Sequence, residues 1–171
     1  MTTWVDTIKE ALPDYAKDTK LNLDAVMNRS TLPGDVAQGC ALAAAMATGN
    51  GKLVNYIQNS MFEQGADFNA PLTAAAIMAQ NNVWYPYVEM ADDERLKGLP
   101  AQLRMNAIAS NGGTTKDRFE AYSLAASIVG KCHFCVKAHY ETLKDHLSVE
   151  QLRDIGRIAS VINSVAKVLN S

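Results

Sequence analysis

The sequence predicts an all-α fold with a two-fold internal helical repeat. Apolar residues recur at helical spacing from one end of the chain to the other. No stretch shows the sustained apolar and polar alternation, bounded by hairpin turns, that indicates a β-strand. The chain of 171 residues is long enough for one hydrophobic core, so we expect a single domain over residues 1–171.

The composition is that of an ordinary globular protein, with 48% hydrophobic and 20% charged residues. The net charge of −2 and the scattered Lys and Arg residues argue against binding to nucleic acid or to an anionic membrane surface. The longest apolar run, Ala41–Ala47, is too short to span a bilayer. The first residues lack the basic and apolar segments of a secretion signal, so we expect a cytoplasmic protein.

The first half of the chain contains four expected helices, separated by residues that break helices. The first begins at Trp4 and is stopped by Pro13, and the second covers Leu21–Met27. Asp35–Ala47 is rich in alanine, the residue with the highest helix propensity. Lys52–Gly65 follows as a separate amphipathic helix after a glycine-containing break.

The second half continues the helical pattern. We expect a helix over Leu72–Met90 and a brief one over Leu103–Ala109. Thr115 is placed to cap a helix that runs to Gly130. A cysteine-containing cluster then opens a helix that runs to about His146.

The last helix is expected to begin at a capping box. Ser148 at the N-cap, with Gln151 three residues later, has this pattern. The apolar stripe of the helix follows at helical spacing: Leu152, Ile155, Ala159, Ile162, Ala166 and Leu169.

Two segments about eighty residues apart, Asp35–Met61 and Asp117–Leu143, share the order helix, break, helix. In this register, four residues that carry chemistry stand opposite inert ones: Glu120, Cys132, Cys135 and His139 opposite Gln38, Asn50, Leu53 and Ile57. We therefore expect the catalytic half of the domain at about residues 115–171.

The cluster GKCHFCVKAH places two cysteines and two histidines within ten residues. Covalent haem attachment needs a histidine directly after the second cysteine, where this chain has Val136. A structural zinc site needs four ligands, and nothing places Cys40, the remaining thiol, near the cluster. We expect no metal, and we expect Cys40 to be a plain buried thiol. Redox chemistry and burial of inert core cysteines both remain open.

Helical spacing favours thiol chemistry at the cluster. Cys132, Cys135 and His139 are related as i, i+3 and i+7, so both sulfurs and the imidazole lie on one face of a helix. Gly130 is a natural break that leaves Cys132 in the first turn. There the free N–H groups and the helix dipole favour the thiolate.

Glu120 lies in the preceding apolar helix, and a buried carboxylate is costly without a partner. In a helical hairpin that turns at Gly130, Glu120 and His139 are both about 12–15 Å from the turn and can face one another. The alternative is that Glu120 lies at the solvent edge near the start of its helix. In the first arrangement, a carboxylate and a histidine deprotonate a thiol whose sulfenic acid condenses with the neighbouring cysteine.

The pattern Glu120, Cys132-x-x-Cys135, His139 resembles the AhpD-like proteins, alkyl hydroperoxide reductases of the wider carboxymuconolactone decarboxylase-like family. The resemblance extends upstream to AAAIMAQNNVWY and LRMNAIA and covers the chain from about Pro33 to Val168. It implies an all-α fold with repeated helices, and a homotrimer.

The same resemblance implies an antioxidant function. Such proteins reduce the peroxiredoxin AhpC and also reduce alkyl hydroperoxides themselves. Their electrons come from dihydrolipoamide carried by the succinyltransferase subunit of a 2-oxoacid dehydrogenase, and they bind no cofactor of their own.

Carried over to this sequence, Cys135 is the peroxide-attacking thiol, which passes through a sulfenic acid. Cys132 is its disulfide partner and proton donor, and Glu120 and His139 form a proton relay. Relatives can carry a histidine directly before the second cysteine, whereas this chain has Phe134 there. We expect His133 to face solvent.

Two alternatives belong to other functional classes. A decarboxylase-like enzyme acting on a small lactone is one, although acid–base decarboxylation has no use for two vicinal thiols. A non-enzymatic redox sensor or adaptor is the other, in which the disulfide alters assembly. Asn81–Tyr85 could line the site or a subunit contact, or it could be ordinary core.

Overall fold

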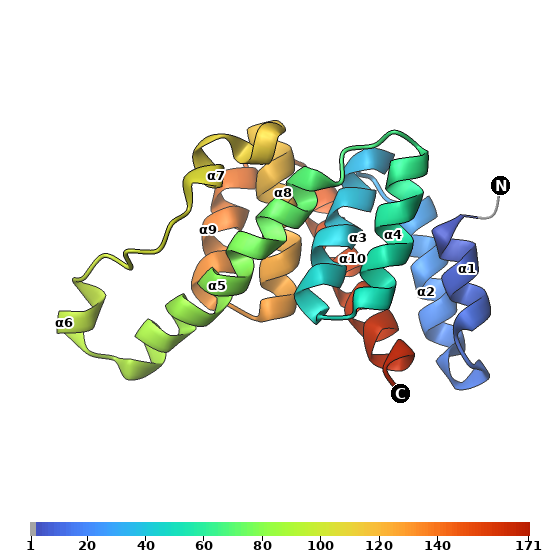
Figure 1. Cartoon of the computed structure of the whole chain (residues 1–171), viewed down its shortest axis with the longest axis horizontal. Coiled ribbons are helices and arrows are strands. Elements are labelled where there is room, and N and C mark those ends of the chain that lie inside the picture. The colour runs from blue at the N-terminus through green and yellow to red at the C-terminus, as the bar shows by residue number, and fades with distance from the viewer. Residues whose placement is uncertain (1–2) are drawn as a thin grey trace.

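The computed structural model describes residues 3–171, and this part of the chain is helical with no β-strand, which confirms the all-α prediction. Figure 1 shows the arrangement of the α-helices. The elements are α1 (Trp4–Ala11), η1 (Asp14–Ala16), α2 (Lys17–Asn28), α3 (Gly34–Thr48), α4 (Gly51–Glu63), α5 (Asn69–Ala91), α6 (Glu94–Lys97), α7 (Asn106–Ala109), η2 (Asn111–Gly113), α8 (Lys116–Gly130), α9 (His133–Leu143) and α10 (Val149–Leu169).

The core is built around α3 and α8, which pack against one another. Both helices are rich in small residues, so their backbones can approach closely. Gly39 of α3 lies against the ring of Tyr122 of α8, and an added Cβ at Gly39 would collide with that ring. α5 and α10 each pack against both central helices, while α4 covers α3 and α9 covers α8.

The internal repeat is visible in the helix boundaries. The same offset of 82 residues separates Gly34 from Lys116 at the starts of α3 and α8, and Thr48 from Gly130 at their ends. Gly49 and Lys131, at the same offset, both adopt the left-handed conformation that ends these helices. The second helix of each hairpin then begins after a two-residue link.

The capping box predicted for α10 is present. Ser148 accepts a hydrogen bond from the Gln151 backbone N–H, and the Gln151 side chain accepts one from the Ser148 N–H. At α8 the prediction was half right, because Thr115 occupies the N-cap position but its side chain makes no capping hydrogen bond.

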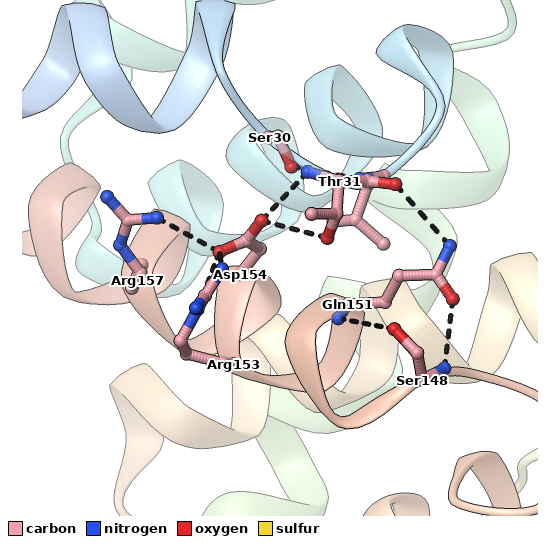
Figure 2. A network of polar contacts seen from close by, with 8 residues as sticks. Ser30, Thr31, Ser148, Gln151, Arg153, Asp154 and Arg157 are labelled. Atoms are coloured by element: carbon pink, nitrogen blue, oxygen red, sulfur yellow. Dashed lines mark hydrogen bonds and ion pairs between the residues drawn. The ribbon is translucent and has the colours of Figure 1, made fainter.

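A buried carboxylate ties α10 to the loop between α2 and α3 (Figure 2). Asp154 is 1% exposed, and its Oδ2 accepts hydrogen bonds from the N–H and hydroxyl of Thr31 at 2.8 and 2.9 Å. Its Oδ1 accepts from Arg153 and Arg157 at 3.1 and 3.0 Å. Burial alone would raise the pKa of Asp154, but the hydrogen bonds from Thr31, Arg157 and Arg153 outweigh it and lower the pKa to about 2.

The segment between α5 and α7 forms an arm that projects from the body of the molecule (Figure 1). α6 is a single turn at its tip, capped by Asp93, and residues 98–105 return to the body without regular structure. The helix expected over Leu103–Ala109 is therefore wrong at its start, because only Asn106–Ala109 is helical. No helix in residues 3–171 is long and apolar enough to cross a bilayer.

Candidate functional site

The two cysteines of the cluster lie at the start of α9 and form a disulfide bond, with Cα atoms 5.3 Å apart. Cys132 is the N-cap of α9, where its Sγ accepts a hydrogen bond from the Cys135 N–H at 3.2 Å. Cys132 is fully buried and Cys135 is 3% exposed. The positive φ of Lys131 ends α8 and turns the chain toward α9.

Glu120 of α8 and His139 of α9 meet across the same hairpin. Glu120 Oε2 lies 2.6 Å from His139 Nδ1, and both side chains are about 85% buried, with 14% and 15% of their areas exposed. The hairpin arrangement expected from the sequence is thus confirmed, and the solvent-edge alternative for Glu120 is wrong. The short link between α8 and α9 explains this pairing. Residues that are equally far from the turn in sequence lie side by side along the two helices.

Met78 of α5 completes the contacts of His139, and sequence reasoning did not identify it. Its Sδ lies 3.2 Å from His139 Nε2, and the side chain is 1% exposed. A thioether sulfur can only accept, so Nε2 carries a hydrogen and donates it to Met78. In the sequence, Met78 belongs to the apolar residues of a helix, and a methionine at such a position is expected to be an ordinary core residue.

Two open hollows flank the start of α9. The smaller, of about 290 Å³, reaches Cys132 and is lined by Lys131, Cys132, His133, Val136, Lys137, Tyr140 and Glu141. The larger, of about 590 Å³, is lined by Tyr85, Val88, Glu89, Lys97, His133, Phe134 and Lys137. Of the two cysteines, Cys132 lines the smaller hollow and Cys135 lines neither of these two.

The two residues between the cysteines both face outward. The His133 side chain is 85% exposed, as expected, and its Nδ1 lies 3.7 Å from Glu89. Phe134 is 54% exposed and stacks on Tyr85 with ring centroids 4.2 Å apart. Tyr85 therefore contributes to the surface beside the cysteines, one of the possibilities that the sequence left open for Asn81–Tyr85.

Cys40 lies apart from the pair, in the interior of α3. It is fully buried as a free thiol, and burial raises the pKa of that thiol, so it stays protonated at neutral pH. This agrees with the expected plain buried thiol. Within residues 3–171, no three His, Cys, Asp or Glu side chains are grouped so that they could hold a metal ion.

The cysteine pair and the Glu120–His139 pair lie one helical turn apart, because Cys135 and His139 are related as i and i+4 on α9. A disulfide stores the two electrons when it is reduced, and the adjacent carboxylate and histidine can take up or release a proton. The two cysteines, Glu120 and His139 are all largely shielded from water. Charges that develop on them therefore interact more strongly with neighbouring groups than they would in water.

Comparison with known proteins places the chain in a family. A match to the carboxymuconolactone decarboxylase family covers residues 95–171, which include the cysteine-bearing hairpin. Alkyl hydroperoxide reductase AhpD of Rhodospirillum centenum is 41% identical over 170 residues, 98% of this chain and 91% of that protein. AhpD of Coxiella burnetii is 43% identical, covering 96% of both chains, and AhpD of Mycolicibacterium smegmatis is 39% identical, covering 96% and 94%. The chain therefore belongs to the AhpD proteins of the carboxymuconolactone decarboxylase family.

Proposed function

We propose that this protein is an antioxidant thiol oxidoreductase, an alkyl hydroperoxide reductase that also reduces the peroxiredoxin AhpC with electrons from dihydrolipoamide. The observation that carries the proposal is the buried Cys132–Cys135 disulfide beside the Glu120–His139 pair. The name of the AhpD relatives supports the same class of reaction. No bound cofactor is required, because the two thiols carry the electrons.

In the peroxidase half-reaction, the Cys135 thiolate attacks the terminal oxygen of the hydroperoxide, the one that bears the hydrogen. The O–O bond breaks, Cys135 becomes a sulfenic acid, and the alkoxide leaves as an alcohol with a proton supplied by His139 and Glu120. The Cys132 thiol then condenses with the sulfenic acid, which releases water and forms the disulfide. Cys132 is thus the disulfide partner and the second proton donor.

In the reductive half-reaction, a thiolate of dihydrolipoamide attacks Cys132, and Cys135 leaves as the thiolate. The second thiol of the donor then displaces Cys132 and closes the lipoamide ring. The smaller hollow supports attack at Cys132, since Cys132 lines it and Val136 and Tyr140 offer apolar walls to an alkyl chain. The carrier is proposed to be the lipoyl group of a dihydrolipoamide succinyltransferase.

The reduced pair can also pass its electrons to a protein disulfide. Cys135 or Cys132 attacks the disulfide of AhpC, and the remaining thiol resolves the mixed disulfide by the same exchange chemistry. We place this cycle in the cytoplasm, where the surrounding thiol pool is reducing and a vicinal pair can turn over.

The carboxymuconolactone decarboxylase description of the family match favours a second candidate, acid–base decarboxylation of a small lactone at Glu120 and His139. That chemistry needs no thiols. Product formation from a lactone by the double variant Cys132→Ser, Cys135→Ser would support it over the redox cycle.

The steady-state test follows oxidation of dihydrolipoamide by an alkyl hydroperoxide, coupled to NADH through lipoamide dehydrogenase. We expect turnover in the wild type, none above background in Cys135→Ser, and wild-type turnover in Cys40→Ala, which removes the thiol outside the site. Equal rates in the wild type and Cys135→Ser would contradict the proposal.

A further inference from the structure

Two serines on α8 are buried without a hydrogen-bond partner. Ser123 and Ser127 are both 0% exposed, and neither Oγ is hydrogen-bonded to any atom of residues 3–171. A buried hydroxyl without a partner costs free energy, and alanine would fill nearly the same volume at no such cost. The disulfide form of the protein therefore carries two buried donors that are not used.

The first serine lies level with the second cysteine. The contact between Glu120 and His139 fixes the height of α8 relative to α9. Ser123 is three residues nearer the turn than Glu120, and Cys135 is four residues nearer than His139, so both lie about 4.5–6 Å closer to the turn. Ser123 also lies on the same face of α8 as Glu120, at i+3, which is the face that meets α9.

The second serine lies level with the first cysteine by the same reasoning. Ser127 is seven residues nearer the turn than Glu120, and Cys132 is seven residues nearer than His139. The backbone agrees, because the Cys132 N–H donates to the Ser127 carbonyl at 3.4 Å. The hairpin register therefore places one serine at the height of each cysteine.

The first copy of the repeat serves as an internal comparison. At the offset of 82 residues, Ala41 and Ala45 occupy the positions of the two serines, and both are 0% exposed. In that copy Asn50 and Leu53 stand in place of the cysteines. Alanine thus satisfies the packing at these positions, and hydroxyls occur in the copy that has sulfurs.

We propose that Ser123 and Ser127 donate hydrogen bonds to the sulfurs of the reduced cysteine pair, Ser123 to the Cys135 thiolate and Ser127 to Cys132. A disulfide sulfur is a weak acceptor, whereas a thiolate bears a full charge and makes charge-assisted hydrogen bonds. The partner of each hydroxyl is therefore created when the disulfide is reduced. This inference rests on the proposed redox cycle, and it names residues that the cycle has not used.

The reduction step that creates these partners balances. A donor dithiol supplies two electrons and two protons, the S–S bond opens, and the donor becomes a disulfide. One proton stays on the Cys132 sulfur, and the other is held between Glu120 and His139, which leaves the thiolate on Cys135. The Ser123 hydroxyl then stabilises that charge, so the pair is easier to reduce than it would be with alanine at this position.

The test measures the equilibrium between the full-length protein and a small dithiol of known potential, without peroxide or AhpC. We expect Ser123→Ala to shift this equilibrium about tenfold toward the disulfide, which corresponds to about 30 mV for a two-electron couple. The rate at which iodoacetamide alkylates Cys135 rises with pH as the thiolate forms. The pH at which this rate is half-maximal should rise by about one unit in the same variant. Thermal unfolding of the disulfide form should not be lowered, since an unused donor has been removed.

Ala41→Ser is the matched control, because it buries a hydroxyl at the equivalent place in the copy without sulfurs, and the dithiol equilibrium should not move. If Ser123→Ala leaves both the equilibrium and the alkylation profile unchanged, the hydroxyl does not bond the sulfur and the inference is wrong. Because the assay needs no peroxide, a wild type without peroxidase turnover would overturn the proposed function while leaving a serine effect visible.

Discussion

Among the single residues of the site, His139 is held at both ring nitrogens. Glu120 binds Nδ1 at 2.6 Å and Met78 binds Nε2 at 3.2 Å, so the ring has little freedom to rotate. Because both ring nitrogens are occupied, His139 has to release one of these two contacts before it can pass a proton to the cysteine pair. In the proposed cycle the carboxylate contributes more than orientation, because it stores the proton that leaves with the alcohol.

Glu120→Gln should remove that store while keeping the shape of the side chain. We expect kcat/KM for peroxide reduction to fall by about 100-fold, at the low end of the range for general acid–base groups. The fall should be accompanied by a changed pH profile, measured in the coupled NADH assay.

Asp117→Asn is the matched control for this substitution. Asp117 also stands on α8 and lies 3.8 Å from His146 beyond α9, but both of these side chains are about half exposed. Its kcat/KM should match that of the wild type. Equal losses in the two variants would show that the effect is general to the hairpin and would rule out a specific relay.

For the helices, the sequence predicted most of the elements that position the site, because their boundaries depend on local signals. Helices end at Pro13 and at the glycines near residue 49, and the last helix begins at the Ser148–Gln151 capping box. These residues act on the backbone next to them, so their effect can be predicted from the sequence alone. α6 was not predicted because a four-residue turn shows no periodicity. Met78 could not be identified, since its role depends on how α5 crosses α9.

The packing of α3 on α8 makes a prediction at the same scale. Gly39→Ala should destabilise the protein by about 1–3 kcal/mol, because the new Cβ collides with the buried ring of Tyr122. Gly156→Ala, also inside a helix but with nothing within 4 Å of the added Cβ, should stabilise it by about 0.5–1 kcal/mol. Urea unfolding of both variants measures the difference. Similar values for the two would contradict the close approach of these helices.

In the whole molecule, the repeat explains why the chemistry is confined to one half. Both hairpins begin with a helix of 15 residues and have the same left-handed link, but the N-cap that is Asn50 in the first is Cys132 in the second. Each side chain accepts a hydrogen bond from the third residue of its helix, so a sulfur has taken over a structural capping position. The repeat in the sequence predicted that Asn50 and Cys132 occupy equivalent positions. The left-handed conformation of the residue before each of them was found only in the structure.

The Asp154 network joins the loop between α2 and α3 to α10 and should make stability depend on pH (Figure 2). Its folded pKa of about 2 lies below the ordinary value of 3.8, so the stabilisation is present above the ordinary value and is lost as the pH falls toward 2. We expect Asp154→Asn to cost about 2 kcal/mol at pH 7.

The cost of Asp154→Asn should shrink between about pH 5 and pH 2, which denaturant unfolding at several pH values measures. Asp24→Asn, which disrupts the part-exposed pair with Lys9, should change stability little at any pH. A cost for Asp154→Asn that is constant with pH would contradict a charged Asp154 in the fold.

The arm formed by the second half of α5, α6 and residues 98–105 carries exposed apolar side chains. Val83, Met90 and Leu99 are 70%, 78% and 63% exposed. Exposed apolar groups on a projecting element are typical of subunit contacts, and we propose that the arm mediates a homotrimer. Met90→Glu should dissociate it to monomers in sedimentation experiments, whereas Leu21→Glu on α2, also at an exposed position, should not. A monomeric wild type would contradict the trimer.

The central claim is that Cys132 and Cys135 form a two-electron relay, and a single-turnover electron balance tests it most directly. The protein is reduced, freed of reductant and mixed anaerobically with disulfide-form AhpC, and the disulfides of both proteins are counted by mass spectrometry. We predict one Cys132–Cys135 disulfide formed for each AhpC disulfide reduced, and no complete transfer from Cys132→Ser or Cys135→Ser. Reduction of AhpC without formation of the Cys132–Cys135 disulfide, or no reduction at all, would contradict the relay.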